Sequence, residues 1–494
     1  MRRATMDLSP SVHFAASAAA GARVIVVPYP LQGHITPLMQ LSKLMASQGL
    51  SVSFVTSRYC ISKITSSKQS FSAHQIFPGI DLVGIDDGYG GSEDHDLMIN
   101  PEKFLESLEL LHLSFVKLLD RTVGEEGIRI ACIISDSFLP WTQDVANQWS
   151  IPRICFWPNS LSVFSCSMSI PSLAVSSPAL NPFNARVYET SNGEFVTSIP
   201  GIPEIRACML PFHTLGGERS EAWMRHQIET QIQQINEYKA IIFNASPCLE
   251  PEVHACMKEL LPSDKVFYTL GPLVPSSILS SESDDQGTGS SMFDEDEACV
   301  EWLDTQSPHS VLYISLGSLI TFYDEAELQE FTSGLLDSKQ PFLWVFRPSA
   351  LLPTPRMECS FGKIIEWAPQ LRVLAHNAVG GFLTHCGWNS TLESLLMGVP
   401  VLGWPQMLDQ TTNCWFLTEK LKVGLRLESM QSKKVDHKSL ENSIRRLMVG
   451  EEAKLFRARA NEVRDMAKEA CTQSSLSSVL ESLVSTIVSL NHTK

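Results

Sequence analysis

Residues 379–393 read Val-Gly-Gly-Phe-Leu-Thr-His-Cys-Gly-Trp-Asn-Ser-Thr-Leu-Glu, and this stretch decides the fold class. Its first six residues are almost wholly apolar, which is typical of a strand buried on both faces of a sheet. Ser390 followed by Glu393 is the pattern of a capping box, so we expect a helix to begin at Ser390. A strand that runs directly into a helix is the building unit of a parallel α/β sheet.

Other apolar runs alternate with amphipathic stretches on both sides of this unit. Strands are predicted at 23–28, 51–56, 128–135, 153–156, 239–243 and 266–269, and again at 311–316, 342–346, 364–367, 379–384 and 399–404. Helices are predicted among them, at 37–48, 101–119, 221–237, 250–261, 325–338, 369–376 and 390–397, and after them at 438–448, 453–470 and 475–490. The pattern predicts two doubly wound, Rossmann-like parallel sheets that face a cleft, because such sheets bind ligands at the carboxyl ends of their strands.

A polar stretch separates the two halves of this α/β pattern. Residues 275–299 are rich in Ser and Gly and carry seven acidic side chains but no Lys or Arg, which indicates a solvated linker. The predicted organisation is a disordered extension at 1–21, an N-terminal domain at 22–274, the linker at 275–299, a C-terminal domain at 300–465 and helices at 466–494 that pack back on the N-terminal domain.

The composition excludes several classes of protein. The 494 residues are 44% hydrophobic and 19% charged, and the formal net charge of −16 argues against a nucleic-acid binder. No apolar run reaches the ~20 residues of a membrane helix, and the 12 cysteines include no Cys-x-x-Cys pair. We expect reduced thiols in a monomeric, cytoplasmic protein without an integral membrane segment. The glycine-rich turns of nicotinamide dehydrogenases and NTPases and the nucleophile elbow of hydrolases are absent from the sequence.

Two side chains suited to proton transfer follow strands in the first half. His34 is expected in a loop after the strand at 23–28, with Thr36 capping the next helix and Pro37 at its first position. Asp136 ends another strand, where it either caps a helix or accepts a hydrogen bond from one ring nitrogen of His34, leaving the other nitrogen to take a proton. Both lie at strand carboxyl ends, so a contact is geometrically plausible, and a purely structural role for His34 is equally open.

In the second half, polar side chains also gather after strands. The helix start at Ser390 presents free N–H groups that suit a phosphate, although Glu393 there could serve only as a cap. Trp367 could stack on a nucleobase with Gln370 at its edge, unless it is a core residue. Three further residues follow strands and suit a phosphate or sugar hydroxyls: Ser318, Asp409 and Gln410.

These residues fall in a recognisable box. Trp-Ala-Pro-Gln at 367–370, His-Cys-Gly-Trp-Asn-Ser-Thr-Leu-Glu-Ser at 385–394, Gly-Val-Pro at 398–400 and Asp-Gln at 409–410 span 44 residues. The stretch resembles the plant secondary product box of the plant-type UDP-dependent glycosyltransferases of family 1, which have the GT-B fold. The resemblance extends from about residue 23 to the C-terminal helices. It implies an inverting transfer of a sugar from a UDP-sugar, bound by the C-terminal domain, to a hydroxyl of a small lipophilic acceptor in the N-terminal domain.

The resemblance also implies roles for individual residues. His34 matches the family's catalytic base and Asp136 its partner. The donor residues are Trp367, Ala368 and Gln370 for uracil, Glu393 for ribose, Ser318, His385, Asn389 and Ser390 for the diphosphate, and Trp388, Asp409 and Gln410 for the sugar.

The nature of the substrates follows from the same resemblance. A Gln at the last box position, Gln410, resembles users of UDP-glucose more than users of UDP-galactose. The acceptor is expected to be a phenolic, a terpenoid or a hormone-like compound. Its pocket is expected around Phe138, Trp157, Phe164 and Met209, unless these are core residues.

No metal or other cofactor is expected, because the helix start supplies positive potential and the Asp-x-Asp triplets at 94–96 and 294–296 lie in polar loops. Residues 347–362 depart from the family pattern, since they form a shorter stretch without its Gly-Phe element. Two alternatives stay open: a nucleotide-sugar-binding protein without catalysis, and a UDP-sugar epimerase of related fold.

Overall fold

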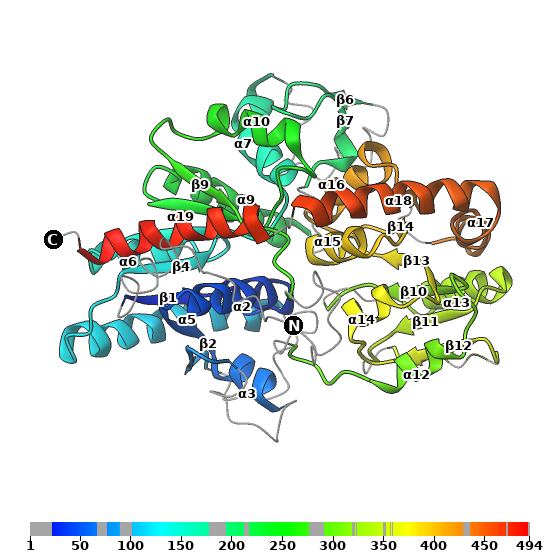
Figure 1. The fold of residues 1–494 in the computed structure, drawn as a ribbon, viewed down its shortest axis with the longest axis horizontal. Coiled ribbons are helices and arrows are strands. Elements are labelled where there is room, and N and C mark those ends of the chain that lie inside the picture. The colour runs from blue at the N-terminus through cyan, green and yellow to red at the C-terminus, as the bar shows by residue number, and fades with distance from the viewer. Residues whose placement is uncertain are drawn as a thin grey trace, which may run out of the picture.

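The structure is a computed structural model with two α/β domains side by side (Figure 1). It describes residues 22–66, 77–88, 101–176, 194–211, 217–275, 291–318, 322, 324–348, 352–355, 357, 359–427, 435–470 and 473–492. The extension predicted at 1–21 and the triplet at 94–96 lie outside these residues.

The N-terminal domain is built on a seven-stranded sheet in the order β3-β2-β1-β4-β5-β8-β9, in which every strand pair is parallel. β1 and β4 are almost fully buried, as their apolar sequences require. The strand order reverses between β1 and β4, which is where such sheets place their ligands. The strands are β1 (Arg23–Val27), β2 (Ser51–Ser57), β3 (Ile80–Ile85), β4 (Cys132–Asp136), β5 (Arg153–Trp157), β8 (Ala240–Phe243) and β9 (Val266–Thr269).

The C-terminal domain repeats this plan with six parallel strands in the order β12-β11-β10-β13-β14-β15. Its order reverses between β10 and β13, both fully buried. The strands are β10 (Val311–Ser315), β11 (Phe342–Val345), β12 (Gly362–Ile365), β13 (Val379–Thr384), β14 (Val401–Gly403) and β15 (Gly424–Arg426). The prediction of two doubly wound parallel sheets is confirmed.

Helices cover the sheets. In the N-terminal domain they are α2 (Gln32–Ser47), α3 (Arg58–Ser66), α5 (Pro101–Leu119), α6 (Trp141–Gln148), α7 (Leu161–Ser176), α9 (Gly217–Gln234) and α10 (Pro251–Leu260). After the linker come α12 (Ala298–Asp304), α13 (Glu325–Ser338), α14 (Gln370–Ala375), α15 (Trp388–Met397), α16 (Gln410–Trp415), α17 (His437–Met448), α18 (Gly450–Ala470) and α19 (Gln473–His492). Smaller elements are the antiparallel pair β6 (Phe195–Val196) and β7 (Ile205–Arg206), and the short helices Asp120–Glu125, Ala207–Met209 and Phe416–Lys420.

The last helix returns to the first domain. α19, red in Figure 1, lies beside α2 and the N-terminal sheet. Its side chains Leu483 and Ile487 are fully buried in the same apolar core as α2, and Thr486 hydrogen-bonds to Tyr268 of β9 with 2.7 Å between the hydroxyl oxygens.

Neither membrane spans nor disulfides are found in the described part of the chain. None of its helices combines the length and the apolarity that crossing a bilayer requires. The eleven cysteines described are all free thiols, and seven of them are buried: Cys60, Cys132, Cys155, Cys166, Cys299, Cys386 and Cys414.

Among the helices that begin earlier than predicted, two carry site residues. α2 begins at Gln32, so His34 lies in its first turn and not in a loop, and Pro37 stands inside the helix. α15 begins at Trp388 after Gly387, and no side chain caps it, so the predicted capping box of Ser390 and Glu393 was wrong.

Candidate active site

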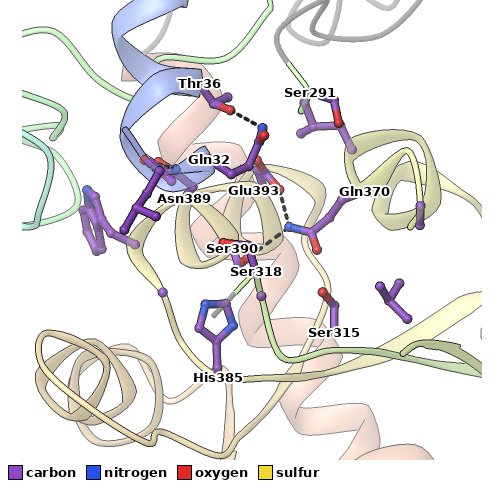
Figure 2. A pocket seen from close by; sticks show the side chains of 18 of the residues that line it. Gln32, Thr36, Ser291, Ser315, Ser318, Gln370, His385, Asn389, Ser390 and Glu393 are labelled. Carbon is purple, nitrogen blue, oxygen red and sulfur yellow. Dashed lines mark hydrogen bonds between the residues drawn. The ribbon is translucent and has the colours of Figure 1, made fainter. Parts of the chain in front are cut away.

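A cavity of about 260 Å³ opens between the domains (Figure 2). The N-terminal domain contributes the first turn of α2 and the residues after β5, and the C-terminal domain contributes the segments that follow β10, β13 and β14. His34 lines the cavity, and so do all eleven residues predicted to bind the donor: Ser318, Trp367, Ala368, Gln370, His385, Trp388, Asn389, Ser390, Glu393, Asp409 and Gln410.

His34 and Asp136 contact each other where the strand order of the first sheet reverses, between β1 and β4. The distance from His34 Nδ1 to Asp136 Oδ2 is 2.8 Å, and Asp136 is fully buried whereas the His34 side chain is 19% exposed. The other carboxylate oxygen of Asp136 accepts from the backbone N–H of Phe138 at 2.9 Å. An ionised carboxylate can only accept, so Nδ1 carries the proton and Nε2 keeps its lone pair. Asp136 does not cap a helix, because α6 begins only at Trp141.

A buried arginine supports this pair from behind. Arg153, 1% exposed, donates from Nη2 to the carbonyl oxygen of Asp136 at 3.1 Å and from Nε to Ser135 Oγ at 2.6 Å. Its guanidinium carbon lies 4.8 Å from the centroid of the Tyr238 ring. These contacts fix the backbone at the end of β4, which limits the positions that the Asp136 carboxylate can take.

Aromatic rings surround the imidazole of His34. The ring centroids of Tyr29 and Phe138 lie 5.1 Å and 5.4 Å from that of His34, and Phe104 packs against Tyr29. Burial, together with the charge of Asp136, raises the pKa of Tyr29, so its hydroxyl stays neutral. None of the four residues expected in the acceptor pocket lines the cavity. Phe138 lies beside the His34 ring, and the other three are buried in the apolar core: Trp157, Phe164 and Met209.

The start of α15 faces the cavity from the other domain. The first N–H bonded within the helix is that of Thr391, which donates to Gly387 at 2.9 Å, so the three amides before it lack helical partners. His385 lies beside this turn, and burial lowers its pKa to about 4 although a hydrogen bond with the Ser315 backbone opposes the shift. A neutral imidazole and free helix amides together form a site suited to an anion.

Two glycines make room for the His385 ring. A Cβ atom at Gly317 would lie 2.6 Å from His385 Nε2, and one at Gly387 would lie 2.4 Å from the same atom. Gly317 also has a φ of 79°, in the left-handed region that favours glycine. The His385 ring can therefore pack against the turns after β10 and β13 only with glycine at these two positions.

Glu393 and Gln370 are hydrogen-bonded to each other in the wall of the cavity (Figure 2). Gln370 Nε2 donates to Glu393 Oε2 at 2.7 Å and to Ser390 Oγ at 2.9 Å, and Tyr313 donates to Gln370 Oε1 at 3.1 Å. Burial, together with the charge of Glu295, raises the pKa of Glu393 to about 7, against the effect of the Gln370 hydrogen bond.

Trp367 lines the cavity and is held by the linker. The Phe293 ring lies 4.2 Å from the Trp367 ring between centroids, at 32°, and the backbone N–H of Asp296 donates to the Trp367 carbonyl at 3.0 Å. The Arg347 guanidinium lies 4.7 Å from the Phe293 centroid and donates to the Ser318 carbonyl. Ser291 and Glu295 of the linker also line the cavity, so the linker is not a solvated spacer throughout.

Asp409 and Gln410 line the cavity where α16 begins. Asn413 Nδ2 donates to Asp409 Oδ2 at 2.8 Å, and burial raises the pKa of Asp409 to about 6, against the effects of Asn413 and of His34. Gln410 Oε1 accepts from the backbone N–H groups of Gln406 and Met407 at 2.9 and 3.1 Å, which leaves its amide nitrogen for the cavity.

Trp388 and Asn389 reach across to the first domain. The indole N–H of Trp388 donates to the Asn244 carbonyl at 2.6 Å, and Asn389 Nδ2 donates to the Gly33 carbonyl at 2.7 Å. Both side chains, expected to contact the donor, thus also join the two domains.

Sequence reasoning missed several residues of this site. Arg153 stands in an apolar strand, Phe293 in an acidic and serine-rich stretch, and Arg347 at the start of a segment that departs from the family pattern. Two features of the sequence could have revealed them: Arg153 is a charged residue in an apolar strand, and Phe293 is a lone aromatic residue in a polar stretch.

Among the described residues, one group could hold a metal ion: Glu330, Asp436 and His437. None of these three residues lines the cavity.

The chain matches two family models. Residues 236–456 match the UDP-glucoronosyl and UDP-glucosyl transferase model, and residues 21–78 match the glycosyltransferase N-terminal domain model.

Named relatives are similar over nearly the whole chain. The 7-deoxyloganetin glucosyltransferase of Gardenia jasminoides is 34% identical over 94% of this chain and 97% of its own length. The (R)-mandelonitrile beta-glucosyltransferase of Prunus dulcis is 32% identical over 94% of this chain and 96% of its own length.

Solved structures show the same architecture. Os79 from O. sativa in complex with UDP superposes with a TM-score of 0.79 at 27% identity, covering 94% of this chain and 100% of that one. Phytolacca americana UGT2, complexed with UDP-2fluoro-glucose and pterostilbene, gives a TM-score of 0.75 at 26% identity, covering 95% of this chain and 100% of that one. With this fold, this box and these relatives, the chain belongs to the plant UDP-glycosyltransferases of family 1 and is a glycosyltransferase of GT-B fold.

Proposed function

We propose that the protein transfers glucose from UDP-glucose to a hydroxyl group of a small lipophilic molecule, with inversion at the anomeric carbon. The observation that carries this proposal is the position of His34. It lies on the N-terminal wall of the cavity, hydrogen-bonded to the buried Asp136, whereas the free amides of α15 form part of the opposite wall.

His34 acts as the general base in this mechanism. Asp136 holds the proton on Nδ1, so Nε2 removes the proton of the acceptor hydroxyl as the oxygen attacks the anomeric carbon and the bond to the UDP oxygen breaks. Attack from the face opposite the leaving group inverts the configuration. A positioned base contributes about 10²–10⁴-fold to the rate.

The departing diphosphate receives its stabilisation from the C-terminal domain. The amides of Asn389 and Ser390, the hydroxyl of Ser318 and the neutral His385 are all fixed before the reaction, so they can bind the developing charge without reorganisation. These donors act in place of a metal ion, and we propose that the reaction requires none. Uracil stacks on Trp367, Ala368 and Gln370 flank its edge, and Glu393 binds the ribose.

The sugar lies between Asp409, Gln410 and Trp388, next to His34. His34, Asp409 and Gln410 all line the same cavity, so a sugar bound there would lie within reach of the base. A glutamine at position 410 supports glucose as the transferred sugar.

The aromatic surroundings of His34 support an apolar acceptor. Tyr29 and Phe138 place aromatic rings next to the base, and the relatives named above include a 7-deoxyloganetin glucosyltransferase and an (R)-mandelonitrile beta-glucosyltransferase. We propose a phenolic, terpenoid or hormone-like acceptor, in keeping with this apolar wall.

The test is incubation of the purified protein with UDP-glucose and a panel of such acceptors, scored by mass for the gain of one hexose and by NMR for the anomeric configuration. We expect a β-glucoside from the α-linked donor, and loss of turnover with UDP binding retained in His34→Ala. Conversion of UDP-glucose without acceptor would support the epimerase instead. UDP binding without any product, or full activity of His34→Ala, would refute the proposed mechanism.

A further inference from the structure

Pro37 occupies a position in α2 where a proline is costly. A proline inside a helix provides no N–H for the carbonyl four residues earlier, and its ring pushes that carbonyl away from the helix. In α2 this carbonyl belongs to Gly33, in the first turn, directly before His34. Alanine at position 37 would suit the helix far better.

The carbonyl left without a helical partner is used by the other domain. Asn389 Nδ2 donates to the Gly33 oxygen at 2.7 Å, and Figure 2 shows Asn389 beside the helix turn that carries Gln32. A second contact reaches the same turn, because Gln32 Oε1 accepts from the backbone N–H of Met292 in the linker at 2.8 Å. The turn that carries His34 is thus hydrogen-bonded to two other segments, α15 through Asn389 and the linker through Met292.

We propose that Pro37 is a positioning residue for glycosyl transfer: by lacking an N–H it presents the Gly33 carbonyl to Asn389, and this interdomain hydrogen bond sets the distance between His34 and the donor-binding helix α15. The inference deepens the proposed function and rests on it for its catalytic consequence. Asn389 has two amide hydrogens, so one can bond Gly33 while the other remains for a phosphate oxygen.

The kinetic test is Pro37→Ala. Its new N–H would bond the Gly33 carbonyl within the helix and draw it away from Asn389. We expect kcat to fall about 3- to 10-fold, the effect of losing one net hydrogen bond. The Kd of UDP should stay unchanged, because UDP binds the C-terminal domain, and the melting temperature should stay the same or rise.

The matched control is Pro171→Ala in α7. Pro171 is also inside a helix and is exposed, and no hydrogen bond among the described residues reaches the carbonyl of Ser167, four residues earlier, from the other domain. This variant should keep the wild-type kcat. Replacing a proline that has only a structural role would lower stability and activity together, whereas Pro37→Ala should lower activity alone.

A double-mutant cycle with Asn389→Ala isolates the contact. If the contact exists, Pro37→Ala has no further effect on kcat once Asn389 has been replaced. Equal effects in both backgrounds, an unchanged kcat in Pro37→Ala, or failure of Pro37→Ala to fold would each overturn the inference.

A measurement without substrate separates this inference from the proposed function. In the ligand-free protein, Asn389→Ala should speed hydrogen exchange in the first turn of α2, and should not do so in the Pro37→Ala background. Absence of glucose transfer by the wild type would refute the proposed function. The hydrogen-exchange result would still test the contact between Asn389 and Gly33, because it needs no substrate.

Discussion

Asp136→Asn tests whether the carboxylate orients the catalytic histidine. In the wild type, Asp136 accepts from His34 Nδ1 at 2.8 Å and from the Phe138 N–H at 2.9 Å. Asparagine has one acceptor oxygen, and because the Phe138 amide can only donate, we expect that oxygen to stay with Phe138. The asparagine NH₂ then faces Nδ1, which must accept, so the ring proton moves to Nε2. The nitrogen that should take the acceptor's proton is then already protonated.

The expected loss is large and confined to catalysis. We expect kcat to fall by about 10²–10⁴-fold, the contribution of a positioned general base. Asp136 does not line the cavity, so the Kd of UDP should not change. The fold should survive, because asparagine has nearly the same size and keeps the bond to Phe138.

The assay is the initial rate of glucoside formation at saturating UDP-glucose, with UDP affinity measured by calorimetry. Asp144→Asn, an exposed carboxylate on the neighbouring helix α6, is the matched control and should behave as wild type. A loss smaller than about tenfold in kcat, or a parallel loss of UDP affinity, would show that Asp136 does not act through the tautomer of His34.

Three further outcomes are expected. The folded protein holds the Glu393 proton up to a pKa of about 7 instead of 4.5, so its contribution to stability is present at low pH and lost as pH rises through this window. The melting temperature of the wild type should therefore decrease relative to that of Glu393→Gln as the pH rises from 4.5 to about 7. A difference in melting temperature that does not change with pH would contradict the assigned burial of Glu393. Trp367→Ala should weaken UDP binding about 5- to 150-fold, the equivalent of ~1–3 kcal/mol of base stacking, and calorimetry showing no change would exclude Trp367 as the uracil platform. Treatment with EDTA should leave the transfer rate unchanged, and recovery of a lost rate by Mg²⁺ would contradict the metal-independent mechanism.

Much of the architecture could be predicted from the sequence because central strands in parallel sheets are apolar throughout. β13 was placed at its observed bounds for this reason. β3 was missed because it is an edge strand in which only Ile80 and Ile85 are buried, so it has no apolar run to detect.

The donor residues were predicted from the box, but their local geometry was not. The pattern of Ser390 and Glu393 satisfies the rule for a capping box, yet both side chains accept hydrogen bonds from Gln370, which is 20 residues away from Ser390 in the sequence. Such a partner is set by the packing of α14 against α15, which no local pattern reports. Pro37 misled the prediction in the same way, because the Gly33 carbonyl that it leaves without a helical N–H accepts from Asn389 of the other domain.

The return of α19 to the first sheet affects how this enzyme can be recombined with its relatives. A chimera that exchanges only the half before the linker would set a foreign N-terminal core against the native Leu483 and Ile487, two side chains fully buried there. Hybrids made with two crossovers, one in the linker and one between α18 and α19, keep each core with its own chain. Such hybrids should express as soluble protein more often than hybrids with a single junction.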